Sequence, residues 1–298
     1  MYDARDLRVY VSTLAGAACW GLIGLFITPL YNKGFTPWDV VAIRGVLSFA
    51  FLILFMLVFK RDQLKTHLRD HVFFASAGIL GIALYNYFYF DVFSKSNLSL
   101  AVTLLYTGPL FVTVLSRVFF KEYFTGKKAI GVVLSLLGCA LVVGLLPFGE
   151  GSMSYQILFL GIMSGFCYAL FSIFSKPVSG RYSALTVTTY NLLYTSVFML
   201  LTSNITSKAE MFQSPDVWIY SFLLAIVGTI GGFLLYTLGL KSLEASKASI
   251  LTTVEPVVAV LTGVLFLGEY LNFWQVAGIF IVLWSSTIVS KAEANVPS

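Results

Sequence analysis

The sequence contains few charged residues and no long polar segment. Only 11% of its 298 residues are Asp, Glu, Lys or Arg, against roughly a quarter in soluble globular proteins. A soluble domain of this length could not cover its surface with so little charge. Hydrophobic residues make up 58% and the mean hydropathy is +0.87. This composition excludes a soluble enzyme, a nucleic-acid-binding domain and a disordered regulator, and it predicts an integral membrane protein whose surroundings are the lipid bilayer.

Residues that hold metals or cofactors are also scarce. The two histidines, His67 and His71, lie four residues apart, but no Glu or Cys completes a zinc set. The three cysteines, Cys19, Cys139 and Cys167, lie in apolar segments and show neither metal spacing nor a disulfide framework. There is no P-loop motif, so we expect no direct use of ATP. The sequence therefore predicts no catalytic residue, no metal and no cofactor.

Long apolar segments dominate what is present. A helix needs about 20 apolar residues to cross the bilayer core, and the connections between these segments are short, the longest being KRDQLKTHLRDH at 60–71. No connection can hold a soluble domain, so we expect function to reside between the helices. Ten spans are predicted, at 9–31, 38–59, 72–93, 98–119, 129–148, 153–175, 183–206, 217–240, 247–268 and 271–290.

Lysine and arginine indicate the orientation of these spans. With a cytoplasmic N-terminus, 14 of the 19 basic residues fall on the inner side and three on the outer side. Such a bias is the positive-inside signal. The fold class predicted is an all-α membrane protein of ten transmembrane helices with both termini in the cytoplasm, and the location expected is the plasma membrane. The oligomeric state cannot be read from the sequence, and a monomer is compatible with it.

The chain repeats itself at an offset of 147 residues, or 148 in the first span of each copy, where Trp20 matches Tyr168. Because each copy holds five spans, an odd number, the second copy must enter the membrane from the opposite side, and the repeat is inverted. Inverted repeats with a midplane site between them are a recurring design of secondary transporters. The matching pairs include Gly81 and Gly228, Tyr89 and Tyr236, Ala101 and Ala248, Pro109 and Pro256, and Gly131 and Gly278.

These motifs resemble a known family. Two prolines, Pro109 and Pro256, are followed in register by KEY at 121–123 and GEY at 268–270, and an arginine, Arg44, stands early in the second span. The pattern is similar to the EamA-type ten-helix permeases of the drug/metabolite transporter superfamily, with EamA-like units predicted at 12–146 and 155–290. The resemblance implies a secondary transporter of small organic molecules. The copies differ at one position, because Gly108 precedes the first proline where Glu255 precedes the second.

Glu255 is the main candidate for substrate binding. It lies about 4–5 Å from the centre of the ninth span, at a rise of 1.5 Å per residue. A charge at this depth costs roughly 2.5–3.5 kcal/mol, so such residues usually face a cavity or a partner. The functional interpretation is a carboxyl group that binds a cationic part of the substrate or an exchanged proton. The alternative is a protonated glutamate that packs the helix beside the kink expected at Pro256.

Aromatic and amide side chains on other spans are candidates for the same site. Tyr85, Asn86 and Tyr89 lie along the third span, and Trp20 and Tyr168 occupy equivalent positions in the first and sixth. The family resemblance implies a cavity lined by spans 1, 3, 4, 6, 8 and 9, which adds Tyr106 and Tyr236. Each residue alone could serve packing instead. Together with Glu255 they suggest a pocket for a zwitterion, a cation or an aromatic ring.

Arg44 and Asp91 are the other charges inside predicted spans whose roles we consider, as structural or gating residues with Pro109 and Pro256. Arg44 lies about 12–13 Å from Glu255 in depth, too far for a direct pair, but only about 5 Å from Asp91. We therefore expect Arg44 to pair with Asp91 or with an outer-leaflet carbonyl, as a structural contact.

The function predicted is export of amino acids or related metabolites by alternating access around a midplane cavity. Transport of cationic or drug-like compounds and uptake by the same fold are alternatives, and proton coupling through Glu255 is a hypothesis. A membrane-embedded enzyme, a passive channel and a non-transporting assembly protein are competing classes. The first lacks a cluster of His, Asp or Glu near one membrane face. The third would need neither Glu255 nor the paired prolines.

Overall fold

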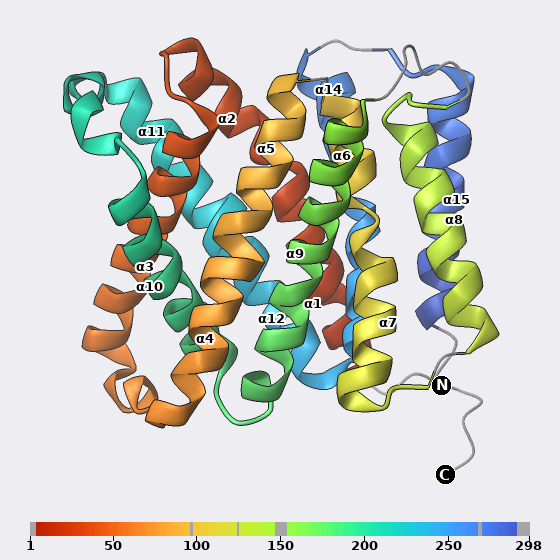
Figure 1. Ribbon diagram of the computed structural model, residues 1–298, viewed down its shortest axis with the longest axis horizontal. Helices are drawn as coiled ribbons and strands as arrows, with labels where there is room; N and C mark the ends of the chain where they lie inside the picture. Colours follow the sequence, from red (N-terminus) through yellow and green to blue (C-terminus); the bar gives the residue numbers. More distant parts are fainter. Residues whose placement is uncertain (1–3, 96–97, 124, 147–153, 268–269, 291–298) are drawn as a thin grey trace.

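The computed structural model describes residues 4–95, 98–123, 125–146, 154–267 and 270–290, and every regular element within these ranges is helical (Figure 1). Residues 268 and 269 of the GEY motif, and the ends of the spans predicted at 129–148, 153–175 and 247–268, lie outside them. The α-helices are α1 (Ala4–Gly21), α2 (Ile23–Asn32), α3 (Pro37–Phe59), α4 (His71–Gly78), α5 (Tyr85–Lys95), α6 (Leu98–Leu105), α7 (Gly108–Phe120), α8 (Gly126–Val142), α9 (Tyr155–Ser179), α10 (Ala184–Thr202), α11 (Pro215–Leu223), α12 (Gly232–Ser242), α13 (Ala245–Leu251), α14 (Glu255–Leu267) and α15 (Phe273–Ser290). The π-helical segments are η3 (Ile79–Leu84) and η5 (Leu224–Gly231), and the 3-10 segments are η1 (Arg61–Leu64), η2 (Leu68–Asp70), η4 (Ile205–Gln213) and η6 (Thr252–Val254).

Eight helical stretches of the described chain are long and apolar enough to cross a membrane. They coincide with eight of the predicted spans. The predicted fifth and tenth spans correspond to α8 and α15, which are shorter and pack against each other (Figure 1). Helix α8 ends at Val142 because Gly144 takes the left-handed region at φ +76. The ten-span count remains a prediction.

The outward faces of the helices are apolar. Val58, Leu201, Leu265 and Phe280 expose 71%, 81%, 76% and 68% of their surfaces. A soluble protein rarely exposes contiguous apolar surface. In a bilayer these side chains contact lipid without cost, so the surface agrees with the composition and marks a membrane protein.

The two halves of the sequence interlock across the bundle. Helix α1 packs against α12, η5 and α14 of the second half, and α9 packs against α4, η3, α5 and α7 of the first. Helix α3 pairs with α10, and α8 with α15. Each half therefore buries its first helix against the third and fourth spans of the other half, and the core sits where the halves meet.

Irregular turns recur at equivalent positions of the halves. The π-helical segment η3 in the third span corresponds to η5 in the eighth at the offset of 147. The fourth span is interrupted between α6 and α7, and the ninth is interrupted at η6, the equivalent position. Such turns leave backbone carbonyls without their usual helical partners, so both halves present polar backbone atoms inside the bundle.

Hydroxyl groups from the opposite half bond these carbonyls. Thr195 Oγ1 in α10 donates to the carbonyl of Gly78 at 2.9 Å, and Ser48 Oγ in α3 donates to the carbonyl of Ala225 at 3.0 Å. Gly78 and Ala225 are related by the same offset of 147. Because buried carbonyls need a partner, these crossing bonds hold each π-helical segment against the other half.

The first long helix illustrates how the sequence fixes a helix start. Thr36 accepts a hydrogen bond from the Asp39 backbone N–H, while Asp39 accepts one from the Thr36 backbone at 2.7 Å, and Pro37 follows at the first helical position. This capping box satisfies donors that the helix leaves open. Lys208 Nζ of η4 lies 2.7 Å from Asp39 Oδ2 and donates to the carbonyl of Gly34, which ties η4 to the start of α3.

A buried ion cluster ties α7, α8 and α13 together at the lower end of the bundle in Figure 1. Lys128 Nζ lies 3.0 Å from Glu244 Oε2 and 3.8 Å from Glu122 Oε2, and Lys247 Nζ lies 3.1 Å from Glu244. Burial alone would raise the pKa of Glu244, but its hydrogen bond to Lys128 and the nearby lysine charges hold that pKa below its ordinary value. Helix α1 begins and α15 ends at this same end of the bundle.

Candidate functional site

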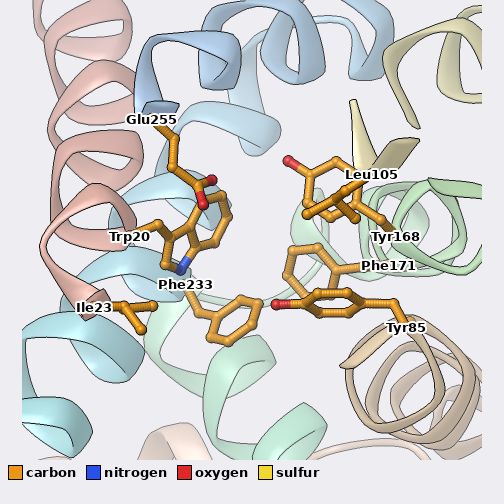
Figure 2. Close-up of a pocket in the computed structure, with 9 residues that line it drawn as sticks. Trp20, Ile23, Tyr85, Leu105, Tyr168, Phe171, Phe233 and Glu255 are labelled. Atoms are coloured by element: carbon orange, nitrogen blue, oxygen red, sulfur yellow. The ribbon is translucent and has the colours of Figure 1, made fainter. Parts of the chain in front are cut away.

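A small cavity lies where the halves meet. Its volume is about 30 Å³, which is space for about two water molecules at 10–15 Å³ each. It draws residues from the first, third, fourth, sixth, eighth and ninth spans, so both halves build it. Its walls are Trp20, Ile23, Gly81, Tyr85, Leu105, Tyr168, Phe171, Phe233 and Glu255 (Figure 2).

Glu255 enters the cavity from the interruption of the ninth span. The hydroxyls of Thr252 and Thr253 donate to the carbonyls of Ser249 and Ile250, both at 2.7 Å, inside the last turn of α13. Helix α14 then restarts at Glu255. The interruption thus places a carboxylate at the first residue of a new helix, where the helix dipole favours negative charge.

A glycine lets α1 approach this interruption closely. A methyl group on Gly21 would lie 2.7 Å from the Glu255 carbonyl oxygen and 2.7 Å from Val258 Cβ. Side-chain atoms do not approach so closely, so a larger residue would push α1 away. The position therefore sets the distance between Trp20, which precedes Gly21, and Glu255.

The carboxylate of Glu255 is half-buried and forms no ion pair or hydrogen bond within the described part of the chain. Its electrostatic neighbours are the Tyr106 hydroxyl and the Arg44 guanidinium. The Tyr106 hydroxyl is itself buried with no hydrogen-bond partner. A buried polar group without a partner costs about 1–3 kcal/mol. The Glu255 carboxylate and the Tyr106 hydroxyl can therefore each form a further hydrogen bond to a molecule in the cavity.

Trp20 contributes a second unused polar atom. It is 6% exposed, and its Nε1 has no partner among the described residues. Its indole ring packs 5.3 Å from the ring of Phe233 and 5.5 Å from that of Tyr236. In Figure 2 the Glu255 carboxylate lies beside the indole. An unused donor and a carboxylate therefore both belong to the lining of this one small cavity.

Two tyrosines form the facing wall. Tyr85 and Tyr168 meet edge to face with ring centroids 5.9 Å apart. The Tyr168 hydroxyl lies 2.9 Å from Thr252 Oγ1, which connects the sixth span to the interruption of the ninth. The ring contact therefore joins the two halves, and the hydrogen bond connects two spans within the second half.

The other predicted residues of the site lie outside the cavity lining. Tyr236 is fully buried behind Trp20 with its hydroxyl 2.6 Å from Ser172 Oγ. Asn86 Nδ2 donates a hydrogen bond to the carbonyl of Ile82, one turn earlier in the same span, at 2.6 Å. The half-buried Tyr89 packs on Phe90. Of the residues predicted to bind substrate, Trp20, Tyr85, Tyr168 and Glu255 line the cavity, and Tyr106 lies next to Glu255.

Arg44 bonds a hydroxyl and a backbone carbonyl rather than Asp91. It is 4% exposed, and its Nε donates to Thr229 Oγ1 at 3.1 Å while Nη2 donates to the carbonyl of Gly228 at 3.5 Å. The expected pair with Asp91 is wrong, because Asp91 Oδ2 lies 2.7 Å from Lys95 Nζ one turn along its own helix. The π-helical segment η5 provides the carbonyl instead.

The two prolines begin helices rather than bend them. Pro109 stands in the first turn of α7 and Pro256 in the first turn of α14. A first-turn proline lacks only an N–H that has no intrahelical partner there. Each follows the interruption of its span and keeps the new helix from fusing with the preceding one.

Comparison with known proteins places this architecture in a family. The sequence pattern of the EamA-like transporter family matches twice, at residues 7–144 and 156–291. The chain belongs to the EamA-like transporter family. An uncharacterized transporter of Archaeoglobus fulgidus is 31% identical over 209 residues, which are 69% of this chain and 73% of that protein. The uncharacterized transporter YyaM of Bacillus subtilis is 25% identical over 94% of this chain and 92% of its own.

A solved crystal structure has the same fold. Its TM-score with this EamA-like transporter is 0.78 at 16% identity, and the alignment covers 97% of this chain and 99% of the other. Family membership and the apolar helices identify the protein as a multi-pass membrane transporter, and the solved structure shows that the fold itself is a known one.

Sequence reasoning missed several residues that line the cavity of this EamA-like transporter. Phe171 follows Tyr168 by three residues, Phe233 precedes Tyr236 by three, and Ile23 follows Trp20 by three. Residues three apart share a helix face. This spacing could have identified them once the first residue of each pair had been placed at the site.

Proposed function

We propose that this EamA-like transporter is a ten-helix secondary transporter that exports amino acids or related small metabolites across the plasma membrane. The observation that carries the proposal is the cavity between the halves, with the unpaired carboxylate of Glu255 against an aromatic lining. A carboxylate and aromatic faces are the groups that bind an ammonium. The proposed substrate therefore carries a cationic group. The proposal also includes cytoplasmic termini and two five-helix repeats of inverted topology.

Alternating access follows from the way the halves interlock. Each half has an interrupted span and a π-helical segment at equivalent positions beside the cavity. If the halves exchange conformations, an opening formed on one side closes as its counterpart opens on the other. The small volume of the cavity corresponds to a closed conformation, because ligand pockets generally measure about 300–1,000 Å³.

Glu255 can also couple transport to protons. A carboxylate that binds either a cationic substrate or a proton permits exchange of one for the other, since both compete for the same charge. The coupling is tested by a pH gradient across proteoliposomes. Transport that accelerates with the gradient in the parent and loses this dependence in Glu255→Gln supports exchange, whereas equal dependence in both contradicts it.

A transporter of cationic, drug-like compounds is the second candidate. The aromatic rings around Glu255 favour it, because quaternary amines are held by such rings without a second polar contact. Amines that bind without any carboxylate would favour this candidate over amino acids.

The test of the proposed function is thermal stability of the detergent-purified protein with amino acids, polyamines, quaternary amines, nucleosides and sugars. A ligand at 100 times its Kd stabilises the folded state by about 2.7 kcal/mol. We expect amino acids to raise the melting temperature of the parent but not of Glu255→Gln. Glu210→Gln, which changes an exposed glutamate in η4, is the matched control and should behave as the parent. Stabilisation by sugars or nucleosides alone would contradict the proposal.

A further inference from the structure

Arg44 is a buried cation that forms no direct ion pair with an acid in the described part of the chain, although Glu255 interacts with it at longer range. Its surface is 4% exposed, and its hydrogen bonds go to the neutral Thr229 hydroxyl and Gly228 carbonyl, with the Tyr85 hydroxyl as a further polar neighbour. No acid lies within ion-pair distance among the residues that the structure describes. Removing a charge from water costs several kcal/mol unless a partner compensates. A guanidinium carries five N–H donors, so these two bonds leave donors unused.

The guanidinium lies next to two residues that line the cavity. Arg44 Cζ lies 5.9 Å from the ring centroid of Phe233, and Arg44 is an electrostatic neighbour of Tyr85. Both rings line the cavity, and in Figure 2 both lie on the opposite side from the Glu255 carboxylate. The cavity therefore has a negative end at Glu255 and a positive end beside Phe233 and Tyr85.

Neither charge belongs to the repeated part of the fold. At the offset of 147, Arg44 corresponds to Asn191, which is neutral, buried and bonded to Ser175 Oγ at 3.0 Å. Glu255 corresponds to Gly108. A charge needed to hold these helices together would be expected in both halves. Each charge occurs in one half only, and the two meet at the same cavity.

We propose that Arg44 determines specificity by binding the anionic group of the substrate, so that the substrate is a zwitterion held between Glu255 and Arg44. The inference rests on the proposed function and narrows it. A carboxylate can approach the free donors of Arg44 at Tyr85 and Phe233 once the cavity expands, and charge-assisted bonds of this kind are short and strong. A substrate with only a cationic group leaves the guanidinium uncompensated.

The test uses three matched ligands, with the full-length protein in detergent. L-phenylalanine carries both charges, L-phenylalaninamide only the cation, and N-acetyl-L-phenylalanine only the anion; the corresponding sets for methionine and threonine cover other side-chain sizes. Dissociation constants come from the dependence of the melting temperature on ligand concentration. We expect the free amino acid to bind about 10–100-fold more tightly than its amide, the loss expected for one charged hydrogen-bonding partner.

Substitutions at Arg44 test whether this residue causes the preference for the amino acid over its amide. In Arg44→Gln the preference for acid over amide should disappear, while Arg44→Lys should keep part of it because the charge remains. The ligand series on the parent needs no variant and stands even where a substitution prevents folding. An amide that binds the parent as tightly as the acid, or an acid preference that survives Arg44→Gln, would overturn the role of Arg44.

The proposed function fails in a different way. If amines and amides bind in a Glu255-dependent manner without any preference for the carboxylate, the inference is wrong and the transport proposal keeps its cationic form. If neither the amino acids nor the amines of the wider panel bind, the proposed function itself is contradicted, and the assignment of Arg44 with it.

Discussion

Removal of the Glu122 charge should loosen the lower end of the bundle. Its side chain is 8% exposed, and its carboxylate accepts hydrogen bonds from the backbone N–H groups of Ala245 at 2.8 Å and Ser246 at 3.3 Å, and from Ser246 Oγ at 2.5 Å. These are the donors that open the N-terminus of α13, the helix that leads to Glu255. The carboxylate thus connects the end of α7 to the start of the interrupted ninth span.

The effect of Glu122→Gln follows from these contacts. The amide keeps one acceptor but presents an N–H₂ group to backbone donors, and it loses the charge that favours a helix N-terminus. Hydrogen bonds to charged groups contribute about 1.5–3 kcal/mol, and the remaining acceptor retains part of that. We expect a loss of about 2–3 kcal/mol. At roughly 2–4 °C per kcal/mol for chains of this size, the melting temperature should fall by about 4–12 °C.

The assay is thermal unfolding of the purified protein in one detergent, followed by intrinsic fluorescence. Glu210→Gln, on the exposed surface of η4, makes the same chemical change without these contacts and should shift the melting temperature by less than about 1 °C. A Glu122→Gln protein that melts with the control would refute the view that this carboxylate holds the start of α13.

Three further predictions concern packing, protonation and the π-helical segments. Gly81→Ala places a methyl group 2.5 Å from the α9 backbone and should cost about 1–3 kcal/mol in thermal stability, whereas Gly24→Ala, where nothing lies within 4 Å, should be neutral or slightly stabilising. The lowered pKa of Glu244 stabilises the fold above the ordinary glutamate value of 4.5, and this contribution is lost as the pH falls through the lowered pKa. Below pH 4.5 the parent should therefore lose thermal stability more steeply than Glu244→Gln, and parallel curves would contradict the ion cluster. Thr195→Val removes the partner of the Gly78 carbonyl, directly before η3, and Ser48→Ala removes that of the Ala225 carbonyl in η5; each should cost about 1–2 kcal/mol. Markedly unequal losses would count against the equivalence of the two segments.

Much of this fold is predictable from the sequence because the bilayer imposes a simple requirement. Eight spans were placed to within a few residues from apolar length alone, since a helix that crosses lipid must remain apolar over about 20 residues. Glu255, which the sequence predicts at the site because a charge at that depth is costly, lines the cavity. Trp20 and Tyr168 were found together through the repeat, which transfers a position in one half to the other.

Other features depend on geometry that apolar length does not encode. The depth of Arg44 along a straight helix pointed to Asp91, but Lys95 lies one turn from Asp91 and takes that role through a local i, i+4 pair. The π-helical segment η5 then offers Arg44 a carbonyl. A regular helix predicts Tyr85, Asn86 and Tyr89 together at the site. Tyr85 lines the cavity with Gly81, whereas Asn86 and Tyr89 lie outside its lining, because the π-helical segment η3 just before them changes the helical phase.

The most direct test of the central claim is counterflow of a radiolabelled amino acid in proteoliposomes that contain equal amounts of the parent, Glu255→Gln or Glu210→Gln. If the cavity beneath Glu255 is the transport site, the parent and Glu210→Gln should show saturable counterflow with an unlabelled amino acid on the opposite side. Glu255→Gln, folded to the same melting temperature, should then show less than about a tenth of it, as expected for the loss of one charged contact. Counterflow that is equal in all three proteins would place the transport site elsewhere and contradict the account.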